Sequence, residues 1–183
     1  MTGSDQGKKQ SMGHGPTEST LAREIKQGKP FLSPELEAYL NLIRTCDQLE
    51  GNIARFLKQH GISAPQYNVL RILRGAEPEG LPSLAVADRM VTRVPDVTRL
   101  LERCVGRGWV TRTRSPQDGR VVIARITDEG LALLATLDEP LVDYHHAQLG
   151  HMDRDELIQL IVLLEKMRAC PDGKPAEGDT ADA

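Results

Sequence analysis

Apolar residues recur at helical spacing through most of the chain between residues 33 and 170. The first such run predicts a long helix that is capped by Ser33, has Pro34 at its first position and ends at His60-Gly61. A helix of about 26 residues is about 39 Å long, which exceeds the diameter of a small domain. We therefore expect a second copy of the chain to cover part of its apolar face.

Three shorter helices are predicted next, each from a start signal followed by an apolar stripe. Ser63 and Gln66 have the spacing of a capping box, Ser83 is a candidate cap, and Pro95 is a candidate first residue. Their expected buried sides are, in chain order, Val69, Leu70, Ile72 and Leu73; Leu84, Ala87 and Met90; and Val97, Leu100, Leu101 and Cys104.

Two β-rich runs follow these helices, at Trp109–Thr113 and Val121–Ile126, and residues 115–120 between them are rich in turn formers. Two short helices joined by a tight turn, the second with a polar outer face, form a helix-turn-helix, and the hairpin adds a wing. The pattern therefore predicts a mainly α fold with a small β-hairpin wing, a winged helix-turn-helix domain with a helical dimerisation region.

The last part of the predicted domain is helical again. Thr127 caps a helix that contains Pro140, where we expect a kink. Asp153 and Glu156 have capping-box spacing and begin a final helix. Its apolar stripe consists of Leu157, Leu160, Ile161, Leu164 and Met167.

Both ends of the chain lack apolar periodicity and are rich in Gly and polar residues, which is typical of disorder. Leu21–Lys29 is a possible short helix within the N-terminal arm, and it either crosses to a partner subunit or remains a tethered arm. The predicted organisation is a disordered arm over 1–32, a winged-helix domain over 33–170 with a DNA-binding lobe at about 63–126 and dimerisation helices at about 33–60 and 128–170, and a disordered tail over 171–183.

Charge is concentrated in one stretch, Arg89–Arg125. It holds nine arginines, no lysine and three acids, a formal charge of +6 in a chain whose total is −3. A positive segment in an otherwise acidic chain favours an anionic partner. Because this segment contains the predicted recognition helix and wing, we expect it to bind duplex DNA.

Several other classes of protein are disfavoured. The chain has no uninterrupted apolar run of about 18 residues and begins without an apolar signal segment, so we expect neither a membrane span nor secretion. Three widely spaced cysteines (Cys46, Cys104 and Cys170) fit no disulfide framework or zinc pattern. We expect a cytoplasmic protein without a cofactor.

Isolated reactive residues have simple structural interpretations. Cys46 lies on or beside an apolar stripe, so we expect it to be buried and inert rather than redox-active, and we place Cys104 in the core. Among His145, His146 and His151 no pair has the i, i+4 spacing of metal ligands, so surface or pocket positions are favoured and no metal site is predicted. No phosphate loop or nucleophile motif is present, so we do not expect an enzyme.

The wing segment carries a resemblance to a known family. Residues from Asp118 to Gly130 resemble the wing signature of the MarR (multiple antibiotic resistance regulator) family, which reads Asp, x, Arg, three residues, Val, x, Leu, Thr, two residues, Gly. Ala124 and Ile126 depart mildly from it, standing where the family has Val and Leu.

Two further segments extend the resemblance over about residues 33–170. Val86–Met90 followed by Val97–Leu100 is similar to the family run Leu-Ala-Glu-Arg-Leu … Val-Thr-Arg-Leu, and Gly61–Tyr67 precedes a Leu-rich helix as in the family. The resemblance implies an obligate homodimer whose first and last two helices pair the subunits. It also implies a pseudo-palindromic operator, and in many members a small phenolic or amphipathic ligand that releases DNA.

Candidate residues follow from the pattern and the resemblance together. Arg99 and Arg103 are the candidate base readers, because a guanidinium can donate two hydrogen bonds to guanine. Arg120 at the wing tip resembles the family's minor-groove arginine. Asp118 is expected to hold Arg120 or Arg114 in position. The full sets are Thr92, Arg93, Asp96, Thr98, Arg99, Arg103, Arg112, Arg114, Asp118 and Arg120 for DNA; Leu36, Leu40, Ile43, Leu157, Leu160, Ile161 and Leu164 for dimerisation; and Tyr39, Tyr67, Tyr144 and His145 for an effector pocket.

The predicted function is a homodimeric, sequence-specific transcriptional regulator, a ligand-responsive repressor with double-stranded DNA as its partner. The alternative is a winged-helix module for protein–protein assembly without specific DNA binding. That role favours an apolar or acidic outer face on the recognition helix, whereas this helix carries Arg99 and Arg103.

Overall fold

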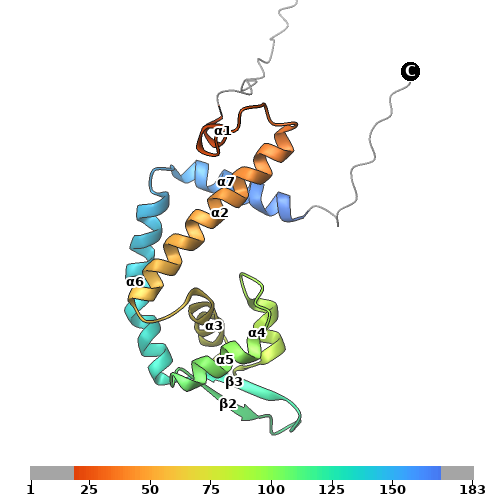
Figure 1. Cartoon of the computed structure of the whole chain (residues 1–183). Helices are drawn as coiled ribbons and strands as arrows, with labels where there is room; N and C mark the ends of the chain where they lie inside the picture. The colour runs from red at the N-terminus through yellow and green to blue at the C-terminus, as the bar shows by residue number, and fades with distance from the viewer. Residues whose placement is uncertain (1–18, 170–183) are drawn as a thin grey trace, which may run out of the picture. The chain divides into compact units, whose positions relative to one another are not determined.

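The computed structural model describes residues 19–169. The disorder predicted for residues 171–183 and for the first 18 residues lies outside this range, as does Cys170. The described chain forms two compact units, one of residues 19–69 and 90–94 and one of residues 70–89 and 95–169. Figure 1 shows the elements of both units along the chain.

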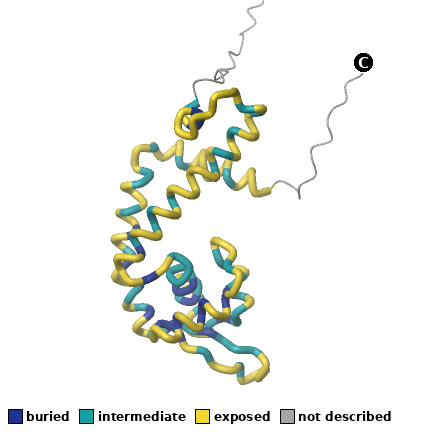
Figure 2. Tube along the Cα trace, in the orientation of Figure 1, coloured by how far each residue is buried: buried dark blue, intermediate teal, exposed yellow. Residues whose placement is uncertain are grey.

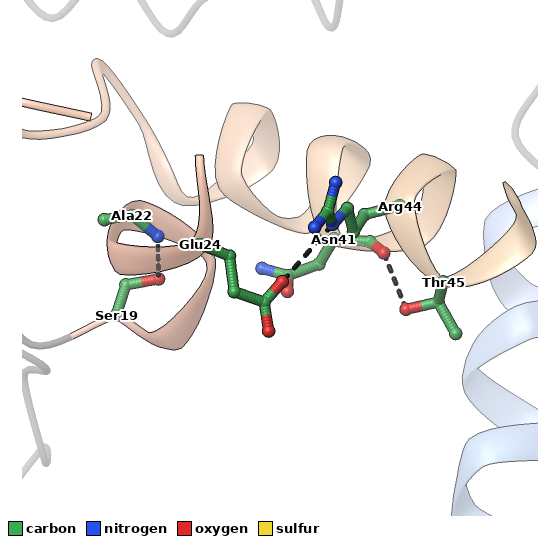
Figure 3. Close-up of polar contacts among 6 residues, drawn as sticks. All are labelled: Ser19, Ala22, Glu24, Asn41, Arg44 and Thr45. Atoms are coloured by element: carbon green, nitrogen blue, oxygen red, sulfur yellow. Dashed lines mark hydrogen bonds and ion pairs between the residues drawn. The ribbon is translucent and has the colours of Figure 1, made fainter. Parts of the chain in front are cut away.

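The first unit begins with the short helix α1 (Thr20–Glu24), which is shorter than the predicted Leu21–Lys29. Ser19 caps α1, and Leu21 and Ala22 are buried. In Figure 3, Glu24 reaches Arg44 of the next helix, with 3.3 Å between the carboxylate Oε2 and the guanidinium Nε. In the single chain, α1 is therefore held on its own neighbouring helix.

That neighbour is α2 (Pro34–Gln59), and its predicted boundaries are confirmed. The Ser33 hydroxyl accepts a hydrogen bond from the backbone N–H of Leu36, and His60 ends the helix with Gly61 in the left-handed region at φ 73°. Leu57 is the buried residue of α2. The burial expected for Cys46 is wrong, because its side chain is exposed.

Helix α3 (Ala64–Arg74) starts with the predicted capping box. The Gln66 amide oxygen accepts from the Ser63 backbone N–H at 3.1 Å, and the Ser63 hydroxyl accepts from the Gln66 N–H at 3.4 Å. Of the expected apolar side, Val69, Leu70 and Leu73 are fully buried, whereas Ile72 is only half-buried. Local cap chemistry thus placed this helix correctly.

The second unit contains a three-stranded antiparallel sheet in the order β1-β3-β2. The hairpin strands β2 (Val110–Arg114) and β3 (Val122–Ile126) agree with the predicted runs, with Arg112 opposite Ala124. The two-residue strand β1 (Leu81–Pro82) was not predicted. Gly80, at φ 72°, precedes it, and a Cβ there would collide with the Ala124 carbonyl oxygen, so this close approach requires glycine.

Helices α4 (Ser83–Arg89) and α5 (Val97–Gly106) pack against each other and the sheet. Three expectations are corrected. Ser83 is the first residue of α4 rather than its cap, Leu84 is 80% exposed while Val86 takes the buried position, and α5 begins at Val97 rather than Pro95. The predicted stripe of α5 is confirmed, since Val97, Leu100, Leu101 and Cys104 are all buried.

Two helices complete the unit, α6 (Asp128–Leu149) and α7 (Arg154–Arg168). The Thr127 cap and the Asp153–Glu156 capping box are both present, as predicted. Helix α6 is continuous through Pro140, and the kink expected there stays a prediction. No residue of α7 is buried, and Figure 2 shows this helix exposed or half-buried along its length.

Candidate DNA-binding surface

The recognition helix α5 presents an arginine-bearing face because its opposite face is locked in the core. Thr98, Arg99 and Arg103 are all exposed. The Asp96 carboxylate caps the helix by accepting from the Arg99 backbone N–H at 2.8 Å. The Asp96 side chain, which is predicted to contact DNA, therefore satisfies one backbone N–H group at the start of α5.

The wing carries a second group of exposed arginines. Arg114 lies at the end of β2, and Arg120 lies in the tip between β2 and β3. The Asp118 carboxylate accepts from the Arg120 backbone N–H at 2.9 Å, and the Asp118 carbonyl accepts from the Val121 N–H at 2.9 Å. Asp118 thus shapes the tip through the backbone of Arg120, whereas we had expected it to hold an arginine side chain.

Arg112, also predicted to bind DNA, is directed at the recognition helix. Its Nη1 lies 3.6 Å from Oε1 of Glu102, and its side chain is only 22% exposed. Its Nε is buried and without a hydrogen-bond partner among the described residues. Sequence reasoning did not select Glu102, and only the pairing of helix and strand places the two side chains together.

Two other arginines of the basic stretch have structural contacts. Arg125 donates from Nη1 to the Thr113 hydroxyl at 2.8 Å and from Nε to the Pro78 carbonyl at 3.2 Å, tying the two hairpin strands to the loop before β1. The Arg107 guanidinium lies 4.7 Å from the centre of the Trp109 ring, a cation–π contact. Some arginines of the basic stretch therefore make contacts within the fold, and the others are exposed.

The remaining predicted contacts, Thr92 and Arg93, lie in the turn that follows α4 in sequence, and both are exposed. This turn belongs to the first unit. The Asn68 amide oxygen accepts from the Val91 backbone N–H at 2.9 Å, which fixes the turn to α3.

The four residues proposed for an effector pocket are divided between the units. Tyr39 is exposed on α2 and Tyr67 half-buried on α3, whereas the rings of Tyr144 and His145 meet edge to face on α6 with centroids 5.7 Å apart. A separate concavity of about 310 Å³ lies beside α1 and α2. Its lining consists of Leu21, Ile25, Leu40, Ile43, Arg44 and Asp47.

Within residues 19–169, no three His, Cys, Asp or Glu side chains are grouped so as to hold a metal ion. Burial raises the pKa of the Cys104 thiol to about 11, although the charge of Arg103 opposes this shift. No helix in the described part of the chain is long and apolar enough to cross a membrane.

The fold and the arginine-bearing surface define a class, the winged helix-turn-helix proteins that bind duplex DNA. A family model described as the MarR family matches residues 60–121. The chain belongs to the MarR family of transcriptional regulators, which are not enzymes.

Solved structures of relatives support this assignment. A MarR transcription factor from Planctomyces limnophilus is 47% identical, matches 74% of this chain and 98% of its own, and superposes with a TM-score of 0.58. A mutant of MarR from E. coli complexed with operator DNA is 27% identical over 75% of this chain and 98% of its own, with a TM-score of 0.66. The PcaV transcriptional regulator from Streptomyces coelicolor, in complex with its natural ligand, is 29% identical over 66% and 92%, with a TM-score of 0.54.

Proposed function

We propose that this chain is a repressor that binds a pseudo-palindromic operator as a homodimer in the cytoplasm and releases it when a small ligand binds. The observation that carries the proposal is the pair of exposed arginines, Arg99 and Arg103, on the outer face of a helix whose other face is fully buried. A rigid helix with guanidinium groups on its free face suits the major groove.

In this proposal the side chains of α5 contact bases, and the turn that precedes α5 in sequence contacts phosphates. Arg99 and Arg103 donate paired hydrogen bonds to guanine O6 and N7, and Thr98 contacts a thymine methyl group or a phosphate. Thr92 and Arg93 contact the DNA backbone. The relative from E. coli, whose structure contains operator DNA, supports binding of an operator.

The wing serves the adjacent minor groove. Arg120 enters it, where a narrow A·T segment concentrates negative potential, and Arg114 neutralises a phosphate beside it. The hydrogen bonds at the wing tip support this role, because Asp118 fixes the backbone from which the Arg120 side chain extends. Arg112 acts indirectly, since it is paired with Glu102.

Dimerisation is supported by apolar side chains that the single chain leaves open. On α2, Leu36 and Ile43 are exposed, and on α7 Leu160 and Ile161 are exposed. Isolated helices of about 15 residues are marginal in water, so α7 requires an apolar partner for stability. The proposed interface residues are Leu36, Leu40, Ile43, Leu157, Leu160, Ile161 and Leu164.

We also propose that a small ligand controls DNA binding. PcaV, whose structure contains its natural ligand, supports it by family likeness. Of the four predicted residues, Tyr144 and His145 lie together on α6, and we propose that they contact an aromatic or amphipathic ligand.

Selection of bound sites from a random duplex pool tests the function. We expect one enriched motif with two half-sites related by a two-fold axis and spaced by one helical turn of DNA. Binding should also weaken steeply as salt rises, because phosphate contacts release counterions. A protein that enriches no motif and binds duplex weakly at every salt concentration would instead be a protein–protein assembly module.

A further inference from the structure

Glu102 occupies an unexpected place on the recognition helix. At about 100° per residue, Arg99 and Glu102 lie about 30° on either side of the centre of the outward face, while Thr98 and Arg103 lie about 70° from it. The centre of the face that we propose for the major groove therefore holds one positive side chain, Arg99, and one negative side chain, Glu102. Glu102 is the acid of this helix, and its side chain is 61% exposed.

A bare carboxylate facing DNA is repelled by the phosphates, so Glu102 requires a reason and a counter-charge. Arg112 on β2 supplies the counter-charge, with 3.6 Å between its Nη1 and Oε1 of Glu102. At this distance the contact is an ion pair rather than a hydrogen bond. The carboxylate therefore keeps its acceptor positions open to a further donor.

The surroundings of Arg112 suit an ion pair with Glu102 better than a contact with a DNA phosphate. Its side chain is mostly covered, and its buried Nε makes no hydrogen bond within residues 19–169. Arg112 pairs across the sheet with Ala124 of β3, which is fully buried, so the two side chains start from the same face of the sheet. The guanidinium is thus a largely covered positive charge beside Glu102.

We propose that Glu102 is a specificity-determining residue that accepts a hydrogen bond from the exocyclic N4 amine of cytosine, and that Arg112 is its positioning residue. The proposal rests on the proposed function, since it needs α5 in the major groove. Cytosine is the base that offers a lone donor group there, and Glu and Asp are the side chains that accept from it. With Arg99 one helical turn away as a guanine reader, the centre of α5 is suited to a segment containing both G and C.

Site selection with matched variants tests this assignment. Wild type should enrich cytosine at one position of each half-site, and Glu102→Ala should lose that preference alone. Glu102→Gln, which is nearly isosteric, should shift the same position toward adenine, because a side-chain amide pairs with adenine N6 and N7. In competition binding, the cytosine preference should fall by roughly 5-fold, the low end of the range for a bidentate base contact, because cytosine N4 offers a single hydrogen bond.

Arg112 is tested by rescue. Arg112→Met should weaken the cytosine preference without introducing one for adenine, and Arg112→Lys should restore part of it. A purely structural role would lower thermal stability and affinity for all sequences equally. Thermal melting of each variant identifies those that fail to fold, and Glu102→Gln keeps the test valid in that case.

The outcomes separate this inference from the function on which it rests. If wild type enriches a palindromic motif and both Glu102 variants enrich the identical motif, Glu102 does not read a base and the inference is wrong. If wild type enriches no motif, the proposed function itself fails.

Discussion

Arg74 at the end of α3 and Asp138 on α6, which are 64 residues apart in sequence, form a bidentate ion pair. The Nη1–Oδ2 distance is 2.8 Å and the Nη2–Oδ1 distance is 3.0 Å. Both side chains are partly exposed. The pair ties the helix that precedes the recognition region to the long helix that leads toward the proposed dimer contact. Its paired geometry is the specific arrangement that arginine, unlike lysine, can offer a carboxylate.

Removing this pair should cost little stability, and the cost should depend on pH. Hydrogen bonds from Arg74 hold the pKa of the Asp138 carboxyl below its ordinary value of 3.8. The lowered pKa stabilises the fold above pH of about 4, and this contribution is lost as pH falls through the folded-state pKa. Arg74→Met should therefore lower the free energy of unfolding by about 1 kcal/mol or less at pH 7, since the pair is partly exposed.

Urea denaturation at pH 7 and at acidic pH checks this expectation, with Arg89→Met, which removes an exposed arginine of α4, as a control. The difference between wild type and Arg74→Met should be largest at pH 7 and should shrink as the pH falls below about 4. A difference that stays constant with pH would mean that Arg74 acts through packing alone.

The cap of the recognition helix should be separable from its DNA contacts. Asp96→Ala removes the acceptor for the Arg99 backbone N–H and should destabilise the fold by about 1 kcal/mol, whereas Asp96→Asn should retain most of the stability. Chemical denaturation measures both changes. Operator affinity should follow stability across the two variants, and a large loss of affinity in a fully stable Asp96→Asn would show that the charge itself meets DNA.

The wing arginine has a signature in salt dependence. Arg120→Ala should weaken operator binding and lower the slope of log affinity against log salt by about one unit. Fluorescence anisotropy over a salt series measures the slope. Arg55→Ala, which removes an exposed arginine on α2 outside the basic stretch, should leave it unchanged. Equal slopes for wild type and Arg120→Ala would remove the wing from the interface.

Two neighbouring residues of α7 offer a matched test of dimerisation. Ile161 and Val162 are 54% and 55% exposed, but Ile161 belongs to the predicted apolar stripe and Val162 lies on the other side of the helix. Ile161→Glu should shift the protein to monomers in sedimentation equilibrium, and Val162→Glu should not. Two variants that remain dimeric to the same extent would place the subunit contact elsewhere.

The thiol in the recognition helix should be unreactive. Burial raises the pKa of Cys104 to about 11, so very little thiolate exists near neutral pH. A protein with Cys46→Ser and Cys170→Ser retains Cys104 alone and should react with a thiol reagent only after unfolding. Fast labelling of the native double variant would contradict the burial of this side chain.

Local signals explain what the sequence predicted well. The caps at Ser33, Ser63, Thr127 and Asp153 depend on residues within one turn, so spacing alone identifies them. The stripe of α5 was equally visible because every member lies on one face. The start of α5 was predicted at Pro95, but the Asp96 carboxylate, which accepts from the Arg99 N–H, caps the helix and places its first residue at Val97.

The errors arose where position depends on distant segments. Leu84 and Cys46 have the character of buried residues, yet both are exposed among residues 19–169. Strand β1 is two residues long and ends in proline, so it carries no periodic signal and exists through its pairing with β3. The Glu102–Arg112 ion pair likewise depends on the packing of helix against strand, and no spacing rule anticipates it.

The arginines of the basic stretch carry one further consequence. Between Arg89 and Arg125 there is neither a lysine nor a histidine, and guanidinium groups do not lose their protons in proteins. The attraction of this surface for nucleic acid is therefore insensitive to changes of acidity near neutrality, and it offers no amine to acylating enzymes. Under the proposed function, neither protonation near neutrality nor lysine acylation can change the charge of this stretch, so a ligand that releases DNA must act by another route.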